Sequence, residues 1–106
     1  VEGAPAVVPV VPVADTVKRV AGSVVGETLD RSVLRAAQTP QGFDLRLLRE
    51  ANEKYLAEKP SFVATDDASL MEWFGVPVTT VEGDALAFKI TTPLDLQLAE
   101  SVVGAL

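Results

Sequence analysis

A run of valines near the start of the chain, residues 6–13 (AVVPVVPV), sets the strongest limit on its fold. A β-branched run of this length is typical of a strand buried on both faces of a sheet. Pro9 and Pro12 interrupt the run, and each lacks the backbone N–H that a neighbouring strand would bond. The sequence therefore predicts a strand whose hydrogen-bond ladder is irregular, bulged or at an edge of its sheet.

A second β-rich stretch comes next, and it differs from the first because it carries many polar residues. Residues 15–20 and 23–29 are rich in β-formers and flank Ala21-Gly22, a pattern that predicts a hairpin. Polar and apolar residues alternate poorly along it, which is what we expect of an arm that projects from the body of a protein. Residues 30–37 predict a short turn or helical piece.

The remainder of the chain alternates helices with short strands. Asp44, Asp66 and Thr92 are suited to be the N-caps of three helices. The predicted helices cover residues 44–57, 66–74 and 92 onward, and the predicted strands cover residues 77–82 and 86–91. Strands that alternate with helices indicate an α/β layer. If two of the predicted strands form a projecting hairpin, the few that remain would make a sheet with uncovered edges. The chain therefore resembles half of a sheet.

The chemical inventory of the 106 residues excludes several classes of function. A formal net charge of −6 argues against a general nucleic-acid binder, although a local cluster of Lys and Arg still suits a small phosphate ligand. The chain has no Cys and no His, which excludes disulfides, thiolate chemistry, zinc fingers and a histidine general base. No apolar run reaches the ~18 residues of a membrane helix, and the start lacks the basic region of a secretory signal. Because the first residue is Val rather than Met, we expect the chain to be part of a longer protein.

Some candidate site residues stand where predicted elements begin or end. Lys89 lies toward the end of a predicted strand, where α/β sheets bind their ligands, although an ordinary surface lysine explains it equally well. Thr65 directly precedes an N-cap residue and so lies near a helix N-terminus, where anions are favoured. The pair Asp66-Asp67 is better explained by helix capping and the helix dipole than by a metal site.

Other candidates have simple structural explanations when they are taken one at a time. Arg31 follows Asp30, so a local ion pair of small energetic value would account for it. Thr16 and Thr39 would individually be strand or cap residues. Trp73 and its neighbour Phe74 are predicted to be core residues rather than a platform for a base.

Taken in order, short blocks of the chain resemble one enzyme family. The blocks are DT-x-K from residue 15, DR-x-x-L from 30, QTPQGF from 38, TDDASL from 65, VEGD from 81 and KITTPLDL-x-LAE from 89. Their order and spacing are similar to those of the methylerythritol phosphate cytidylyltransferases, over residues 7–103. The pentitol phosphate cytidylyltransferases share much of the same pattern.

The resemblance implies a cytoplasmic enzyme of non-mevalonate isoprenoid biosynthesis that transfers a cytidylyl group from CTP to 2-C-methyl-D-erythritol 4-phosphate and releases pyrophosphate. The implied fold class is α/β, with residues 1–106 as the C-terminal half of a single Rossmann-like nucleotidyltransferase domain. A protruding β-arm hairpin at about residues 15–30 would interlock two subunits in a homodimer. Mg²⁺ would be the cofactor, with its ligand in the N-terminal half.

The resemblance also implies roles for five residues. Thr16, Arg31 and Thr39 match positions that reach the sugar-alcohol phosphate across the dimer, and Thr65 and Lys89 match positions that bind it from the body. Arg31 and Lys89 are the expected catalytic residues. The acceptor phosphate is itself the nucleophile, so a chain without His or Cys is no obstacle. The protein has to hold two anions together and stabilise the charge on the transferred group.

The chain departs from the family pattern in what it lacks. We find no glycine-rich CTP loop, no catalytic Arg and Lys of the N-terminal region, and no DAARP-like metal-binding segment. We therefore expect the 106 residues alone to be inactive, with part of the acceptor site and no metal or cofactor site. The alternatives are a cytidylyltransferase for ribitol phosphate or another polyol phosphate, a non-catalytic dimerisation module, and a plain α/β regulatory domain.

Overall fold

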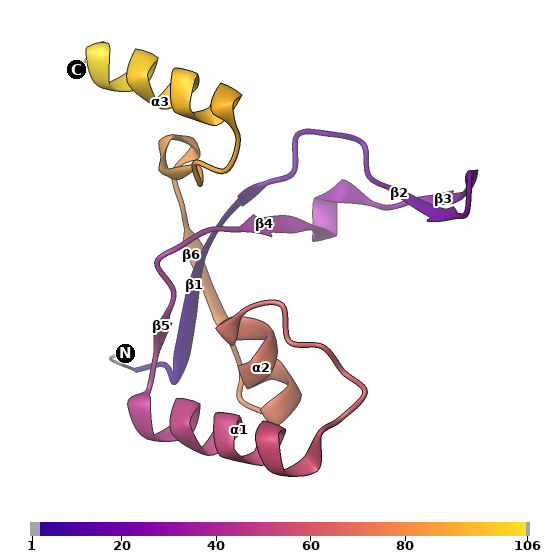
Figure 1. The fold of residues 1–106 in the computed structure, drawn as a ribbon, viewed down its shortest axis with the longest axis vertical. Helices are drawn as coiled ribbons and strands as arrows, with labels where there is room; N and C mark the ends of the chain where they lie inside the picture. Colours follow the sequence, from indigo (N-terminus) through magenta and orange to yellow (C-terminus); the bar gives the residue numbers. More distant parts are fainter. Residues whose placement is uncertain (1–2, 106) are drawn as a thin grey trace.

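The valine-rich strand lies at the centre of the sheet in the computed structural model, which describes residues 3–105 (Figure 1). The elements are β1 (Ala6–Pro12), β2 (Lys18–Ala21), β3 (Val24–Thr28), the 3-10 helix η1 (Arg31–Val33), β4 (Arg35–Ala37), β5 (Gly42–Phe43), α1 (Leu45–Glu58), α2 (Asp67–Phe74), β6 (Thr79–Glu82), the 3-10 helix η2 (Ala85–Ala87) and α3 (Pro93–Gly104). β4 and β5 pair antiparallel with one side of β1, and β6 pairs parallel with the other. The α/β class is therefore confirmed.

The two prolines of β1 lie at positions where no neighbouring strand needs a backbone N–H from them. The carbonyl of Pro9 accepts from Gln38 N at 2.8 Å, so the backbone of Pro9 faces the β4 and β5 side, at the break between those strands. Pro12 faces the β6 side, two residues past Val10, which pairs with the last residue of β6. Of the predicted alternatives, an edge position is wrong and an irregular ladder is correct. The ladder is interrupted at both prolines, so the strand lies at the centre of the sheet.

Helices α1 and α2 form the packed part of the body, and each begins at its predicted cap. Asp44 Oδ1 accepts from Leu47 N at 3.1 Å, and Asp66 Oδ1 accepts from Ser69 N at 2.7 Å. Between the helices lies a small core centred on the fully buried Met71. The partly buried aromatic residues that pack around it are Phe43, Tyr55, Trp73 and Phe74. Trp73 and Phe74 were predicted to be core residues. The rings of Tyr55 and Trp73 meet edge to face at 5.5 Å.

The predicted hairpin is a separate two-stranded sheet of β2 and β3, and it projects from the body (Figure 1). Every residue of both strands is exposed. Gly22 has a φ of +62° in the connecting turn, a conformation that favours glycine. An ion pair between Arg19 and Glu27 joins the two strands. Residues 30–37, predicted to be a turn or helical piece, form η1 and then β4.

One predicted strand is wrong: residues 86–91 do not form a strand. The carboxylate of Asp84 accepts from Leu86 N at 2.8 Å, and the Asp84 carbonyl accepts from Ala87 N at 2.9 Å. These local bonds wind the chain into η2 and withdraw its backbone groups from any ladder. An aspartate side chain that bonds two residues ahead favours a turn over a strand.

Helix α3 begins at its predicted cap, yet it lies apart from the rest of the body (Figure 1). Thr92 and Asp95 form a capping box, and no residue of the helix is buried. The radius of gyration is 16.8 Å, against roughly 13 Å for a compact chain of this length. The accessible surface is 7913 Å², about 2,200 Å² above that of a compact monomer of equal mass. Within residues 3–105 no helix is both long and apolar enough to cross a membrane.

Candidate functional site

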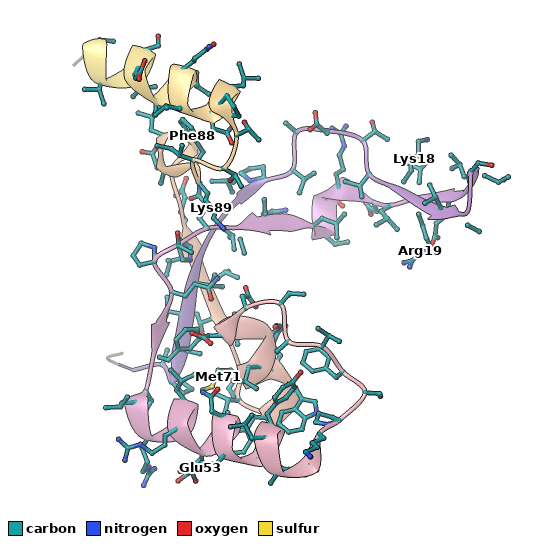
Figure 2. The ribbon with its side chains drawn as sticks, in the orientation of Figure 1. Lys18, Arg19, Glu53, Met71, Phe88 and Lys89 are labelled. Carbon is teal, nitrogen blue, oxygen red and sulfur yellow. The ribbon has the colours of Figure 1, made fainter. Side chains whose placement is uncertain are left out.

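A cavity of about 390 Å³ lies where the β4–β5 connection, the start of α2 and the end of η2 come together. It brings together two predicted site residues, Thr39 and Lys89, that are far apart in the sequence. Figure 2 shows Lys89 beside the crossing of the sheet strands, whereas Lys18 and Arg19 lie far out on the arm. The cavity is lined by Val11, Ala36, Ala37, Gln38, Thr39, Gln41, Asp66, Ala87, Phe88 and Lys89.

Lys89 is the one basic residue among the side chains that line this cavity in the described part of the chain. Its side chain is exposed, so the ammonium group is free to reach a ligand. Its carbonyl accepts from Thr91 Oγ1 at 3.4 Å, and Thr92 then caps the next helix. A compact, flexible charge at such a place suits a phosphate group.

Two glutamines of the QTPQGF block line the cavity, and the sequence alone pointed to no role for either. Gln41 Nε2 donates to the carbonyl of Gln38 at 3.4 Å and to Asp66 Oδ2 at 3.1 Å. The amide therefore ties the β4–β5 connection, which carries Thr39, to the start of α2. The only signal for these residues was their place beside Thr39 in a block with a family resemblance.

Asp66 is a cap residue, as predicted, and it is held ionised. Partial burial raises the pKa of Asp66, but hydrogen bonds from the backbone of Ser69, from the Gln41 amide and from the Ser69 hydroxyl outweigh this, so the pKa lies below its ordinary value. Thr65 precedes it, with its backbone N–H donating to Ser69 Oγ at 3.0 Å. The cap thus places Thr65 at the start of α2, directly before Asp66, which lines the cavity, although Thr65 itself is not a lining residue.

The Asp66-Asp67 pair lies at the start of α2, where a capping role was predicted for it. Across residues 3–105 the structure gathers no group of three acidic, His or Cys side chains. The carboxylate of Asp66 already accepts from Ser69 and Gln41, which agrees with the predicted capping role.

A second, wider cavity of about 620 Å³ adjoins the first near the start of α1. The two cavities share three lining residues, Thr39, Gln41 and Asp66. The second is lined otherwise by Phe43, Leu45, Leu48 and Asp67. It lacks a basic side chain among its described lining residues, so the smaller cavity with Lys89 is the better site for an anion.

The predicted residues Thr16 and Arg31, like Thr65, line neither cavity. Arg31 lies at the base of the arm, where Nη1 donates to the Ala14 carbonyl at 2.5 Å. The carboxylate of Asp30 bonds Ser32 instead, and the Ser32 hydroxyl and N–H lower the pKa of Asp30. A local Asp30–Arg31 ion pair is not among the ion pairs of the described residues. That Thr16 and Arg31 serve a neighbouring subunit remains a prediction.

Comparison with known proteins finds a family that matches almost the whole chain. Residues 1–105 match the family described as IspD, 2-C-methyl-D-erythritol 4-phosphate cytidylyltransferase. The protein of that name from Corynebacterium efficiens is 64% identical over 102 residues, which are 95% of this chain and 41% of that protein. The one from Nocardia farcinica is 61% identical over 102 residues, 95% of this chain and 42% of that protein.

Solved structures agree with the sequence comparison. The crystal structure of 2-C-methyl-D-erythritol 4-phosphate cytidylyltransferase from Thermus thermophilus is similar with a TM-score of 0.82 and 46% identity, over 95% of this chain and 49% of that chain. The bifunctional IspDF of Campylobacter jejuni gives a TM-score of 0.69 and 29% identity, over 91% of this chain and 23% of that one. The chain thus spans about two fifths of the length of the curated relatives that it matches.

Proposed function

The chain belongs to the 2-C-methyl-D-erythritol 4-phosphate cytidylyltransferase family, and from this membership we propose that it supplies the acceptor side of such an enzyme's active site. The complete protein would transfer a cytidylyl group from CTP to 2-C-methyl-D-erythritol 4-phosphate, in the cytoplasm, as a step of isoprenoid biosynthesis. Residues 1–106 would be the C-terminal half of one α/β domain. The observation that carries the proposal is the cavity that Thr39 and Lys89 line together.

The chemistry asks little of acid–base groups, which suits a chain without His or Cys. An oxygen of the acceptor phosphate attacks the α-phosphorus of CTP, and a new P–O bond forms. The bond between that phosphorus and the oxygen that bridges to the β-phosphate breaks, and pyrophosphate leaves with the electron pair. In this proposal Lys89 offsets the acceptor's charge, and the hydroxyls of Thr39 and Thr65 orient its oxygens.

We propose that the arm carries Thr16 and Arg31 to the active site of a second subunit, and that the protein is a homodimer. One observation supports this. An isolated two-stranded hairpin is marginally stable in water, yet this one exposes Val20, Val24 and Val25 by 60%, 67% and 53%.

We propose Mg²⁺ as the cofactor of the complete protein, with its ligands in residues outside this chain, because the carboxylate of Asp66 is already engaged by Ser69 N and Gln41 Nε2. A bound Mg²⁺ would neutralise charge on the triphosphate and orient it. The residues of this chain would bind and orient the acceptor, and nothing in their role requires a metal ligand.

The test is turnover by the protein expressed from its complete coding region. We expect release of pyrophosphate from CTP with 2-C-methyl-D-erythritol 4-phosphate, and a product mass equal to the acceptor plus a cytidylyl group. Ribitol phosphate as acceptor is the comparison, and an equal or greater kcat/KM with it would overturn the assigned acceptor. No turnover with either acceptor would overturn the proposed function itself.

A matched pair of lysine variants examines the site within the same assay. Lys89→Gln removes the one cation of the described cavity lining, and we expect kcat/KM to fall on the order of a hundredfold. Lys59→Gln changes an exposed lysine at the end of α1, away from the cavity, and should leave kcat/KM unchanged. Equal losses in both variants would contradict the role given to Lys89.

A further inference from the structure

The side-chain amide of Gln38 makes a pair of hydrogen bonds with the backbone of Asp84, which lies 46 residues further along the chain. Gln38 Nε2 donates to the Asp84 carbonyl at 2.8 Å, and Asp84 N donates to Gln38 Oε1 at 3.2 Å. The amide thus satisfies both backbone groups of one residue, as a neighbouring strand would. Paired bonds of this kind fix both position and orientation.

This pair of bonds joins segments on opposite sides of the central strand. The backbone N–H of Gln38 donates to Pro9 on one side of β1, at 2.8 Å. On the other side, where β6 ends, Gly83 N donates to Val10 at 2.8 Å. Gln38 therefore locks the end of β4 to the end of β6, with β1 between them.

Gly83 is what lets the glutamine approach. A Cβ at this position would lie 2.3 Å from Gln38 Oε1 and 3.1 Å from the carbonyl of Val10. The backbone of Gly83 is not among those with positive φ, so the glycine serves to make space rather than to permit a turn. Gln38 and the glycine of the VEGD block therefore form one unit.

The segment that comes after Asp84 carries Lys89. The Asp84 carbonyl accepts from Ala87 N as well as from Gln38, and its carboxylate accepts from Leu86 N. Helix η2 thus starts from the residue that Gln38 holds, and Phe88 and Lys89 come directly after it. Gln38 also directly precedes Thr39, so one side chain links both walls of the cavity.

We propose that Gln38 is a positioning residue, which through Asp84 holds Lys89 at the distance from Thr39 that the acceptor phosphate needs. The inference rests on the proposed function, because it assigns the cavity to that phosphate. Only glutamine suits the contact. Glutamate lacks the N–H donor and would set a carboxylate against the Asp84 carbonyl, and asparagine is one methylene shorter.

The test uses the complete protein with both substrates varied. Gln38→Glu and Gln38→Ala should raise KM for 2-C-methyl-D-erythritol 4-phosphate on the order of tenfold to a hundredfold, because misplacement of about 1 Å is enough for such a loss. KM for CTP should change less than about twofold, since the cavity holds the acceptor. The control, Gln97→Ala, removes an exposed glutamine on α3 and should match wild type.

Hydrogen exchange gives a readout that does not depend on turnover. In Gln38→Ala, the amides of Asp84, Leu86 and Ala87 should exchange at least about tenfold faster, while those of α1 stay unchanged. Gly83→Ala alone should raise KM for the acceptor. In the Gln38→Ala background the same change should raise that KM much less, because the new Cβ no longer clashes with the Gln38 amide.

The outcomes separate the two proposals. A wild-type protein without activity overturns the proposed function. An active wild type whose Gln38 variants keep their acceptor KM, or raise both KM values in parallel, overturns the positioning role. Unchanged exchange at residues 84–87 also overturns it, because the bonds would then not hold that segment in solution.

Discussion

Gln41 Nε2 lies 3.1 Å from Asp66 Oδ2, and this hydrogen bond joins the connection that carries Thr39 to the start of α2. The same carboxylate caps the helix through Ser69 N at 2.7 Å. One ionised side chain therefore sets both the helix start and one wall of the cavity. Loss of this charge should therefore weaken both contacts together.

We predict that Asp66 makes the stability of the complete protein depend on pH at the acid end. Its folded pKa lies below the ordinary 3.8, so between the two values the unfolded state binds more protons. The stabilisation is full above about pH 5 and is lost as pH falls through the folded pKa. Urea unfolding of Asp66→Asn should show a shallower acid loss. At pH 7 Asn still caps the helix but loses the bond from Gln41, because only one of its two terminal atoms is an acceptor.

The companion variant Asp66→Ala removes the cap altogether. It should lose about 1 kcal/mol at pH 7, the usual cost of an N-cap truncation. If Asp66→Asn and wild type lose stability in parallel as the pH falls from about 5 to about 3, the acid sensitivity comes from other carboxylates.

We predict a large stability loss from Met71→Ala, because Met71 is 0% exposed in the small core between α1 and α2. Truncation of a buried methionine costs about 2–5 kcal/mol. Leu56→Ala on the same pair of helices, 71% exposed, should cost less than about 0.5 kcal/mol. Urea midpoints of the two variants compare them directly, and similar midpoints would show that the core is not where the structure places it.

We predict that a charge on the arm separates the subunits. Val24→Glu and Val25→Glu each place a carboxylate on an exposed valine of β3, which a dimer interface would bury. Analytical ultracentrifugation should show wild type as a dimer and both variants shifted to monomer. Val63→Glu, in the loop before α2 and 73% exposed, is the matched control and should remain a dimer. A monomeric wild type would refute the interlocking arm.

We predict that Arg31 and Lys89 act in one site from different subunits. Arg31→Ala should lower kcat/KM on the order of a hundredfold, with stability within about 0.5 kcal/mol of wild type, because the one described hydrogen bond of its side chain is to an exposed carbonyl. Mixing Arg31→Ala with Lys89→Gln subunits should then restore about a quarter of wild-type activity, since half of the dimers carry one intact site. Without restoration after subunit exchange, Arg31 acts in its own subunit or not at all.

The helices were predictable because their signals are local. Asp44, Asp66 and Thr92 each cap a helix within three residues of their own position, and Gly75 ends one with a φ of +90°. The arm was predictable for a similar reason, because its two strands are joined by a short turn. Neither needs a contact from elsewhere in the chain to be recognised.

Features that depend on distant partners were not predictable. Strand β5 has only two residues, and it exists because Gly42 and Phe43 pair with β1. The central place of β1 depends likewise on where β4, β5 and β6 end, which no pattern in residues 6–13 reveals. In the site, the resemblance pointed to Thr39 and Lys89, but the contact of Gln38 with Asp84 joins residues 46 positions apart and forms only in the folded chain.

The segment that carries Lys89 is anchored at both of its ends. Gln38 holds it at Asp84, and Asp95 Oδ2 holds it at the other end by accepting from Thr91 N at 3.0 Å and Thr92 N at 2.9 Å. A chain segment fixed at both ends tolerates the substitution of a side chain, but it does not tolerate the insertion or deletion of a residue. In the divergence of this protein lineage, changes of length should therefore collect in the loop after α1 and at the tip of the arm, and spare residues 84–92.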